Sequence, residues 1–320
     1  MVFETVIAIA ALILGIALLT YSSDKAVEHS VKIASALRIS PLMIGLVLMS
    51  IGTDLPEIAN SITSSALGHG DINVGDSLGS VLTQMTLVFG LIPFLGGIFK
   101  VKRKEIAVMG ACEVLALIIA VSMAEKGYIS RMNALFLVAS WPIFLLLTRS
   151  AMAKNAKEKE HVVARTDASN LHHLRHWVIA ILGFIGVAIG AYVVIQSVIT
   201  LSAAFRIPEY LISFFLLAIG TSLPEVVVDL TAVRKKQYEL AVGDAIGSCI
   251  VDACFSIGIG PLLMGKINVS GELVMITGSY AILVSIVIIS TLALREKVDK
   301  KAGALFLFLY LLSYTMFSLT

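Results

Sequence analysis

The chain has 320 residues, of which 58% are hydrophobic and only 14% are charged. A soluble protein carries about 25% charged residues, so this composition excludes an ordinary soluble domain and predicts an all-α polytopic membrane protein. The formal net charge is +2, and the charges form no concentrated basic surface, so we expect a lipid bilayer and no nucleic acid as partner.

Ten apolar segments follow one another along the chain, most of them near the ~20 residues that a helix needs to cross a bilayer. The first begins at Val2 without a basic leader or a small-residue cleavage site, so we interpret it as a membrane helix and not as a signal peptide. The amphipathic stretch from Tyr21 to Ile39 is expected to extend this helix along the interface. The predicted spans are residues 3–23, 41–66, 73–99, 105–124, 130–148, 177–203, 208–232, 239–264, 271–294 and 302–319.

One long polar connector, residues 149–176, separates a first set of five spans (1–148) from a second (177–320). If the amino terminus faces outward, 20 of the 24 Lys and Arg residues fall in inner connectors and 4 in outer ones. By the positive-inside rule, this split predicts a multi-pass protein of the cell membrane with both termini outside and the connector in the cytoplasm. The three cysteines lie in apolar segments and are interpreted as small buried residues, without disulfide or zinc spacing.

Two short motifs interrupt apolar segments. Residues 52–57 read Gly-Thr-Asp-Leu-Pro-Glu, and residues 220–225 read Gly-Thr-Ser-Leu-Pro-Glu. Each proline lacks a backbone donor and clashes with the carbonyl group four residues earlier, so each copy predicts a broken helix with free carbonyl oxygens beside Glu57 or Glu225. Charged groups at membrane depth are costly and usually handle ions or protons, and hard cations prefer such oxygen ligands.

The two motifs belong to a longer internal repeat. When the chain is shifted by 168 residues, positions 50–90 align with 218–258 without a gap, and 13 of the 41 aligned residues are identical. Because each unit has five spans, an odd number, the second unit is predicted to be inverted relative to the first. Inverted repeats with broken helices at the bilayer midplane are typical of transporters.

A second motif pair lies one helix later, Gly-Ser at 79–80 and again at 247–248. Small residues allow close approach of helix backbones. Four residues after each serine, on the same helix face, come Gln84 and Asp252. Together, these hydroxyl, amide and carboxylate groups offer oxygen ligands.

Four further acids have open or structural interpretations. Asp76 and Asp244 are interpreted as helix caps or interfacial charges. Asp229 is either a supporting acid behind Glu225 or a charge at the inner mouth near Arg234. Glu113 either pairs with a neighbouring helix or contributes to a proton path.

The combination of Gly-Thr-x-Leu-Pro-Glu and Gly-Ser-x-x-x-(Asn/Asp), present twice, resembles the two α-repeats of the cation/calcium exchanger superfamily, and most closely prokaryotic sodium/calcium exchangers. The resemblance covers essentially the whole chain. It implies ten transmembrane helices in two inverted five-helix repeats, and alternating access in which sodium and calcium compete for a four-helix centre. The cation ligands that it implies are the carbonyl oxygens of Ser50 and Ala218 and the side chains of Thr53, Glu57, Ser80, Thr221, Ser222, Glu225, Ser248 and Asp252.

Two positions depart from the pattern of that superfamily. Asp54 stands where serine is usual, and Gln84 stands where asparagine is usual. With both included in the site, four carboxylates surround one centre, and they cannot all stay ionised around one divalent ion. The counter-ion therefore stays open among sodium, potassium and protons.

Three functions are weighed. The first is a calcium/sodium antiporter without resident cofactor, expected to work as a monomer, with Ca²⁺ and Na⁺ as substrates. The second is a calcium/proton or potassium-dependent antiporter of the same fold. The third is an enzyme, an intramembrane aspartyl protease, because residues 68–71 spell Gly-His-Gly-Asp. That string falls in a predicted outer loop and does not recur in the second repeat, so an enzyme is not favoured. A passive channel would not require inverted halves.

Overall fold

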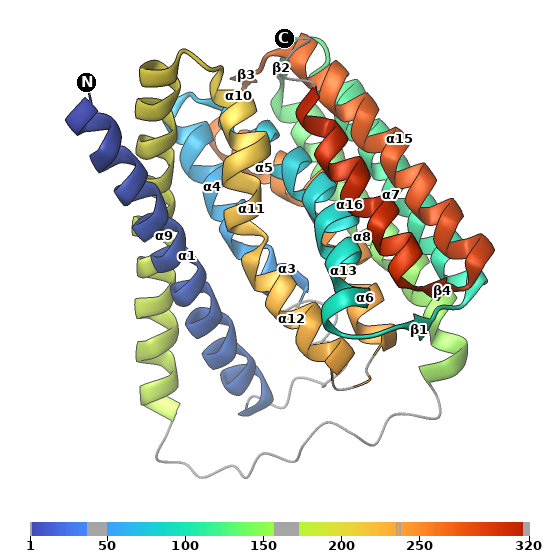
Figure 1. Ribbon diagram of the computed structural model, residues 1–320. Coiled ribbons are helices and arrows are strands. Elements are labelled where there is room, and N and C mark those ends of the chain that lie inside the picture. The colour runs from blue at the N-terminus through green and yellow to red at the C-terminus, as the bar shows by residue number, and fades with distance from the viewer. Residues whose placement is uncertain (1, 37–49, 157–172, 235, 237, 316–320) are drawn as a thin grey trace.

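The computed structural model describes residues 2–36, 50–156, 173–234, 236 and 238–315. The described chain is a bundle of helices with four two-residue strands (Figure 1). The helix α1 begins, and α16 ends, at one face of the bundle, here called the terminal face; α8 ends, and α9 begins, at the opposite face, here called the connector face (Figure 1).

The elements follow the order of the predicted spans. Two of the predicted spans are divided into short helices on either side of a break, and three contain a turn of π-helix. The elements are α1 (Val2–Ala36), α3 (Ser50–Thr53), α4 (Leu55–Leu67), α5 (Gly70–Thr83), η2 (Gln84–Val88), α6 (Phe89–Leu95), β1 (Phe99–Lys100), α7 (Arg103–Ala124), β2 (Tyr128–Ile129), α8 (Arg131–Ala156), α9 (His173–Phe205), α10 (Glu209–Ile212), η3 (Ser213–Leu217), α11 (Ala218–Thr221), α12 (Leu223–Arg234), α13 (Tyr238–Val251), η4 (Asp252–Ser256), α14 (Ile257–Met264), β3 (Ile267–Asn268), α15 (Gly271–Arg295), β4 (Lys297–Val298) and α16 (Lys300–Ser313).

Within the described residues, eight helices are long and apolar enough to cross a membrane. The predicted span 41–66 begins in residues 37–49, outside the described chain, and its described part is broken between α3 and α4. The predicted span 302–319 ends in residues 316–320, also outside it, and α16 has 14 residues. The described helices establish a multi-span bundle, and the full count of ten remains a prediction.

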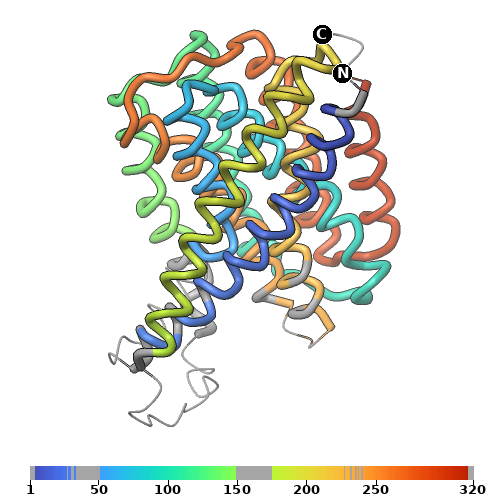
Figure 2. The backbone as a smooth tube through the Cα atoms, turned by 90° about the vertical axis from the view of Figure 1, so that its left-hand side faces the viewer, coloured from blue at the N-terminus to red at the C-terminus, as the bar shows by residue number. Residues whose placement is uncertain are grey.

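The helices α1 and α9 form a long antiparallel pair along one side of the bundle (Figures 1 and 2). Because Gly190 has no side chain, the backbone of Leu19 lies close to it, at 2.9 Å from the position that a Cβ atom would take. The helix α1 is continuous from Val2 to Ala36, which confirms that residues beyond Tyr21 extend the first helix.

The helices α7 and α15 begin 168 residues apart and pack against each other in opposite directions. A strand pair ties them at each end: β1 pairs with β4 at the connector face, and β2 pairs with β3 at the terminal face. These strands could not be predicted from the sequence, because two-residue segments carry no periodic pattern.

The helices that carry the Gly-Ser motifs are the most buried. The span Gly70–Leu95 is 78% buried and Ala241–Met264 is 72% buried, against 28% for Glu4–Ala26 and for Arg131–Thr148. Leu78, Ala116, Ile246 and Ala281, at most 1% exposed, lie in the main core between α5, α7, α13 and α15. The two motif helices are therefore at the centre, and α1 and α8 are peripheral.

Candidate cation-binding site

Both predicted helix breaks are present. Asp54 separates α3 from α4 with φ −80° and ψ 9°, and Ser222 separates α11 from α12 with φ −79° and ψ 6°. Since the two positions are 168 residues apart and nearly identical in dihedral angles, the same local sequence produces the same break twice. From its break, α4 runs toward the terminal face, whereas α12 runs toward the connector face (Figure 1).

The carbonyl groups before the breaks accept hydrogen bonds from different sources in the two repeats. The hydroxyl of Ser23 on α1 donates to the carbonyl oxygen of Gly52 at 3.4 Å, the oxygen that the proline was predicted to free. In the second repeat, the carbonyl oxygen of Ala218 accepts from the amide of Ser222 at 3.1 Å and from the hydroxyl of Thr221 at 3.3 Å. Ser50 begins α3, so its carbonyl group belongs to the corresponding turn of the first repeat.

Three contacts between polar side chains join the first repeat to the second. The hydroxyls of Thr53 and Ser248 lie 3.5 Å apart, and those of Ser80 and Thr221 lie 3.4 Å apart. These two contacts are equivalent, because each residue is 168 positions from its counterpart in the other pair.

The third contact joins two residues that occupy equivalent positions in the two repeats. The Gln84 amide donates to the Asp252 carboxylate at 3.3 Å, and these two residues are each other's counterparts, 168 positions apart. Each begins a turn of π-helix, η2 or η4, and such turns are frequent at functional sites.

The carboxylates beside this contact are completely buried. Asp54, Glu57, Glu225 and Asp252 are each at most 1% exposed. Glu57 accepts from Ser80 at 3.3 Å, whereas within the described chain both carboxylate oxygens of Glu225 and both of Asp54 have no hydrogen-bond partner. Buried oxygens without donors are costly unless a cation or a proton satisfies them.

The four carboxylates repel one another electrostatically: the like charges of Glu57, Asp54 and Asp252 act on Glu225. Among the described residues, no three His, Cys, Asp or Glu side chains converge closely enough to form a metal site by themselves. A cation here therefore needs hydroxyl, amide and carbonyl oxygens in addition to carboxylates. The structure brings such groups together in Thr53, Ser80, Gln84, Thr221, Ser222 and Ser248, which are at most 9% exposed.

The interpretation of Asp76 as a cap or interfacial charge is wrong. Asp76 is 1% exposed and accepts hydrogen bonds from the Asn60 amide at 3.0 Å and from the Thr221 hydroxyl at 3.1 Å. Through Thr221 it is connected to the contact between the repeats. The signal in the sequence is the spacing Asp76, Ser80 and Gln84, which places all three on one face of the helix.

Asp229 and Asp244 form a pair that the sequence analysis did not identify. Asp229 is fully buried, its carboxyl group interacts with that of Asp244, and neither of its oxygens has a hydrogen-bond partner among the described residues. Asp229 is thus a buried acid behind Glu225, and its partner is Asp244 and not Arg234, which is exposed. Asp244 lies in the interior of α13 and therefore is not a helix cap, and it is half-buried; its spacing of four residues to Ser248 places it on the motif face of that helix.

Two other predictions have definite outcomes. Glu113 is fully buried and accepts a hydrogen bond from the Ser285 hydroxyl of α15 at 2.7 Å, which confirms its pairing with a neighbouring helix. Close backbone approach is confirmed at Gly79, where a Cβ atom would lie 2.2 Å from the Phe214 carbonyl oxygen, and is wrong at Gly247, where it would meet nothing within 4 Å.

The Gly-His-Gly-Asp string has a structural role at the terminal face. The Asp71 carboxylate accepts from the Ser270 amide at 2.5 Å and from the Ser270 hydroxyl at 2.6 Å, and His69 contacts Glu209 at 2.8 Å. These contacts tie the turn between α4 and α5 to elements of the second repeat. The three cysteines are buried and free, as predicted.

Comparison with known proteins identifies one family. The model of the family described as sodium/calcium exchanger protein matches residues 7–149 and 175–319, nearly the whole chain. The chain is 29% identical over 310 residues to the uncharacterized membrane protein MJ0091 of Methanocaldococcus jannaschii, covering 96% of this chain and 97% of that one. It is 26% identical over 334 residues to the sodium/calcium exchanger MaX1 of Methanosarcina acetivorans, covering 93% and 95%.

Solved structures of a sodium-calcium exchanger also match this chain. A structure of the sodium-calcium exchanger NCX_Mj, soaked with 10 mM Na⁺ and zero Ca²⁺, matches with a TM-score of 0.62 at 28% identity, covering 97% of this chain and 99% of that one.

Proposed function

The chain belongs to the sodium/calcium exchanger family, and from that premise we propose that it is a secondary-active antiporter that exchanges calcium for sodium by alternating access. The observation that carries this proposal is the pair Glu57 and Glu225, which follow matching helix breaks and hold buried carboxylate oxygens without a hydrogen-bond partner in the described chain. A divalent ion between them would meet one carboxylate from each repeat.

The transported cations bind in this centre, in our proposal, through oxygen atoms of both repeats. Each repeat supplies one carbonyl group from the turn before its break, hydroxyl groups, and one carboxylate beside the break. Gln84 and Asp252 complete the set from the π-helical turns. The proposed ligands are Ser50, Thr53, Asp54, Glu57, Ser80, Gln84, Ala218, Thr221, Ser222, Glu225, Ser248 and Asp252.

The charge balance of the interior supports cation transport. Among the described residues no Lys or Arg side chain is buried. Ionised carboxylates without compensating charge are very costly in an apolar interior, so cations or protons must neutralise them. The fully buried acids are Asp54, Glu57, Asp76, Glu113, Glu225, Asp229 and Asp252.

The inverted plan of two five-helix repeats is part of the same proposal. Supporting it, α4 and α12 run in opposite directions from their breaks, and α7 and α15 are antiparallel and tied at both ends. Two halves of opposite orientation around one site can exchange conformations, and this exchange opens the site to each side in turn. One chain supplies both halves, so a monomer suffices.

Calcium uptake into proteoliposomes tests the function. Purified protein is reconstituted, and initial uptake is compared under an imposed sodium, potassium or proton gradient, one at a time. We expect uptake only under the sodium gradient directed outward from the vesicle. Uptake that is independent of every gradient would contradict antiport.

A proton-coupled or potassium-dependent antiporter is the second candidate, and the excess of buried acids favours it. One calcium ion neutralises two carboxylates, whereas Asp54, Asp76 and Asp229 add three beyond those beside the breaks and Asp252. In this case the proton or potassium gradient drives uptake in the same assay, and the sodium gradient alone does not.

Orientation is proposed from the charge split: the connector 149–176 in the cytoplasm of a cell-membrane protein, and both termini outside. The start of α1 and the end of α16 lie at the terminal face, whereas the end of α8 and the start of α9 lie at the connector face, which agrees with this arrangement (Figure 1). A cysteine at Ala156 should react with an impermeant thiol reagent in inside-out vesicles and not in intact cells, and Lys126→Cys should show the opposite. The native cysteines are buried, so background labelling should be low; labelling of Ala156→Cys in intact cells would reverse the topology.

A further inference from the structure

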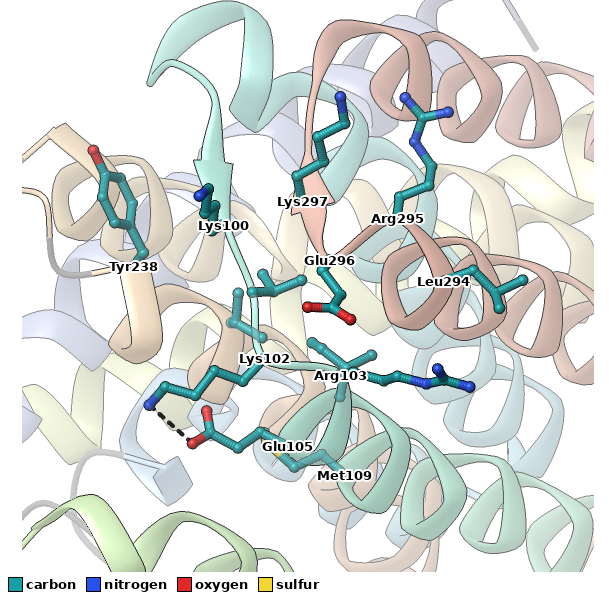
Figure 3. A pocket seen from close by; sticks show the side chains of 13 residues that line it. Lys100, Lys102, Arg103, Glu105, Met109, Tyr238, Leu294, Arg295, Glu296 and Lys297 are labelled. Carbon is teal, nitrogen blue, oxygen red and sulfur yellow. Dashed lines mark hydrogen bonds and ion pairs between the residues drawn. The ribbon is translucent and has the colours of Figure 1, made fainter.

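A cavity of about 780 Å³ opens at the connector face, where α7 begins and α15 ends, beside the first residue of α13 (Figure 3). It is separate from the cation site. Two of the helices around it are candidate membrane spans that begin or end at this point, at Arg103 and at Arg295. The cavity therefore lies at the level of a span boundary, where lipid headgroups would be found.

The rim of this cavity is positively charged. Five cations, Lys100, Lys102, Arg103, Arg295 and Lys297, surround it, and two acids, Glu105 and Glu296, are the negatively charged residues of its lining (Figure 3). The cations exceed the acids, so the cavity favours an anion.

Part of this charge is already neutralised. Lys102 pairs with Glu105 at 3.1 Å, and Arg295 and Lys297 share Asp299 at 2.5 Å and 3.1 Å. No described carboxylate forms an ion pair with Lys100 or Arg103. These two cations are the ones that remain to bind a ligand.

The strand pair adds a second observation. Lys100 lies directly opposite Lys297 in the β1–β4 register, and like charges directly opposite on paired strands repel and destabilise the pair. An anion beside both ammonium groups would relieve this repulsion.

The floor of the cavity is apolar. Val101, Ile106, Met109 and Val242 line it. Leu294, at the rim, is 73% exposed and continues the apolar surface of α15 toward the surrounding membrane. A small soluble anion would gain nothing from this surface, whereas an acyl chain would be buried against it.

We propose that this pocket binds an anionic phospholipid of the leaflet on the connector side. Its phosphate lies between Lys100 and Arg103, with Lys297 nearby, and an acyl chain runs over the apolar floor past Leu294. The Glu296 carboxylate, which points into the cavity (Figure 3), accepts a hydrogen bond from a hydroxyl group of the headgroup. Basic pockets between membrane helices on the cytoplasmic side are suited to anionic headgroups.

Native mass spectrometry of the purified, delipidated protein tests this proposal without any variant. Binding of dioleoyl phosphatidylglycerol is compared with binding of dioleoyl phosphatidylcholine, which has the same phosphodiester but no net charge. We expect at least one phosphatidylglycerol to be retained at concentrations that retain no phosphatidylcholine. Equal retention of the two lipids would overturn the proposal.

A variant and its matched control locate the site. The double substitution Lys100→Ala/Arg103→Ala should weaken phosphatidylglycerol binding by about 25-fold, since each basic residue near a headgroup contributes a factor of about five. Lys104→Ala removes an exposed lysine of the same helix end that does not line the cavity, and it should leave binding unchanged. Equal losses in both would indicate general surface charge and contradict the pocket.

A third measurement distinguishes the source of the phosphate. Soluble glycerol 3-phosphate at millimolar concentration should not displace the lipid, because it lacks the acyl chains that cover the apolar floor. Displacement by it would show a site for a soluble anion instead. None of these measurements depends on transport, so they stand apart from the proposed function.

Discussion

The two repeats have matching helix breaks, yet their equivalent aspartates, Asp76 and Asp244, lie in different environments. In the first repeat, Asp76 accepts hydrogen bonds from Asn60 and Thr221. In the second, the equivalent Asp244 contacts the carboxyl group of Asp229 and has one buried oxygen without a partner in the described chain. Asp229 occupies the position of Ser61, and Val228 occupies that of Asn60, so two sequence differences accompany the change from a neutral environment to an acid pair.

The two repeats also carry their additional carboxylates at different positions. The first repeat has one at its helix break, and the second has one at its π-helical turn. Asp54 in the first repeat corresponds to Ser222 in the second, and Gln84 corresponds to Asp252. Each repeat thus has one carboxylate where the other has a neutral oxygen. A symmetric frame can therefore hold an asymmetric distribution of charge, with the acid pair Asp229–Asp244 on the connector side of the centre.

The largest expected effect tests what the repeats share. Glu57→Gln and Glu225→Gln should each abolish calcium transport, because either change leaves too little negative charge to replace the hydration shell of the ion. Uptake by reconstituted protein measures this. Glu113→Gln is the matched control: it changes an equally buried glutamate outside the motifs, whose partner is Ser285, and should retain transport. Near-normal transport by either of the first two variants would remove that residue from the site.

The next effect tests what differs between them. Asp76→Asn should lower stability by about 1–3 kcal/mol, because the new amide group faces a donor that previously had an acceptor. Asp244→Asn should leave stability unchanged or raise it, since its amide can donate to Asp229. The thermal unfolding midpoint in detergent measures both. Equal losses in the two variants would mean that the two aspartates have the same environment.

A smaller effect concerns the breaks. Asp54→Ser makes the first break identical to the second in sequence and removes one of the four central carboxylates. We expect the pH dependence of calcium uptake to flatten between about pH 6 and 8, because the variant has one fewer acid whose protonation competes with cation binding. Sodium-driven exchange should persist if sodium is the counter-ion. A loss of calcium affinity alone, with unchanged pH dependence, would make Asp54 a plain ligand.

The smallest effect concerns the first helices of the two repeats. The rings of His29 on α1 and His176 on α9 meet at 2.7 Å between Nδ1 atoms, so one nitrogen must donate and the other must accept. Burial lowers the pKa of His29 below its usual value of about 6.5.

The lowered pKa of His29 determines how its contribution to stability changes with pH. Below about pH 6.5 the unfolded chain binds a proton that the folded state resists, so stability falls as pH falls. Between pH 7.5 and 5.5, the change in the unfolding midpoint of His29→Gln should be less destabilising than that of the wild type. His69→Gln is the control, because it removes a histidine that contacts Glu209 at the opposite face of the bundle; an identical response of both variants would contradict the assignment.

The sequence by itself determined the features that depend on neighbouring residues. Pro56 and Pro224 produce their breaks by missing donors and by steric clash, whatever surrounds them, and the 168-residue shift follows from identity along the chain. The apolar spans follow from hydropathy. The positions of Glu57 and Glu225 beside the breaks were predictable for the same reason.

Tertiary structure alone decided which polar groups meet. The contact between Gln84 and Asp252, the hydrogen bonds to Asp76 and the pair Asp229–Asp244 join residues on different helices, and their geometry depends on how the helices pack. The open space at Gly247, against the tight approach at Gly79, has the same origin. Helical periodicity shows which side chains share a face, but the partner of that face is fixed only by the packing of helices distant in sequence, and the cross-strand lysines Lys100 and Lys297 were brought together in the same way.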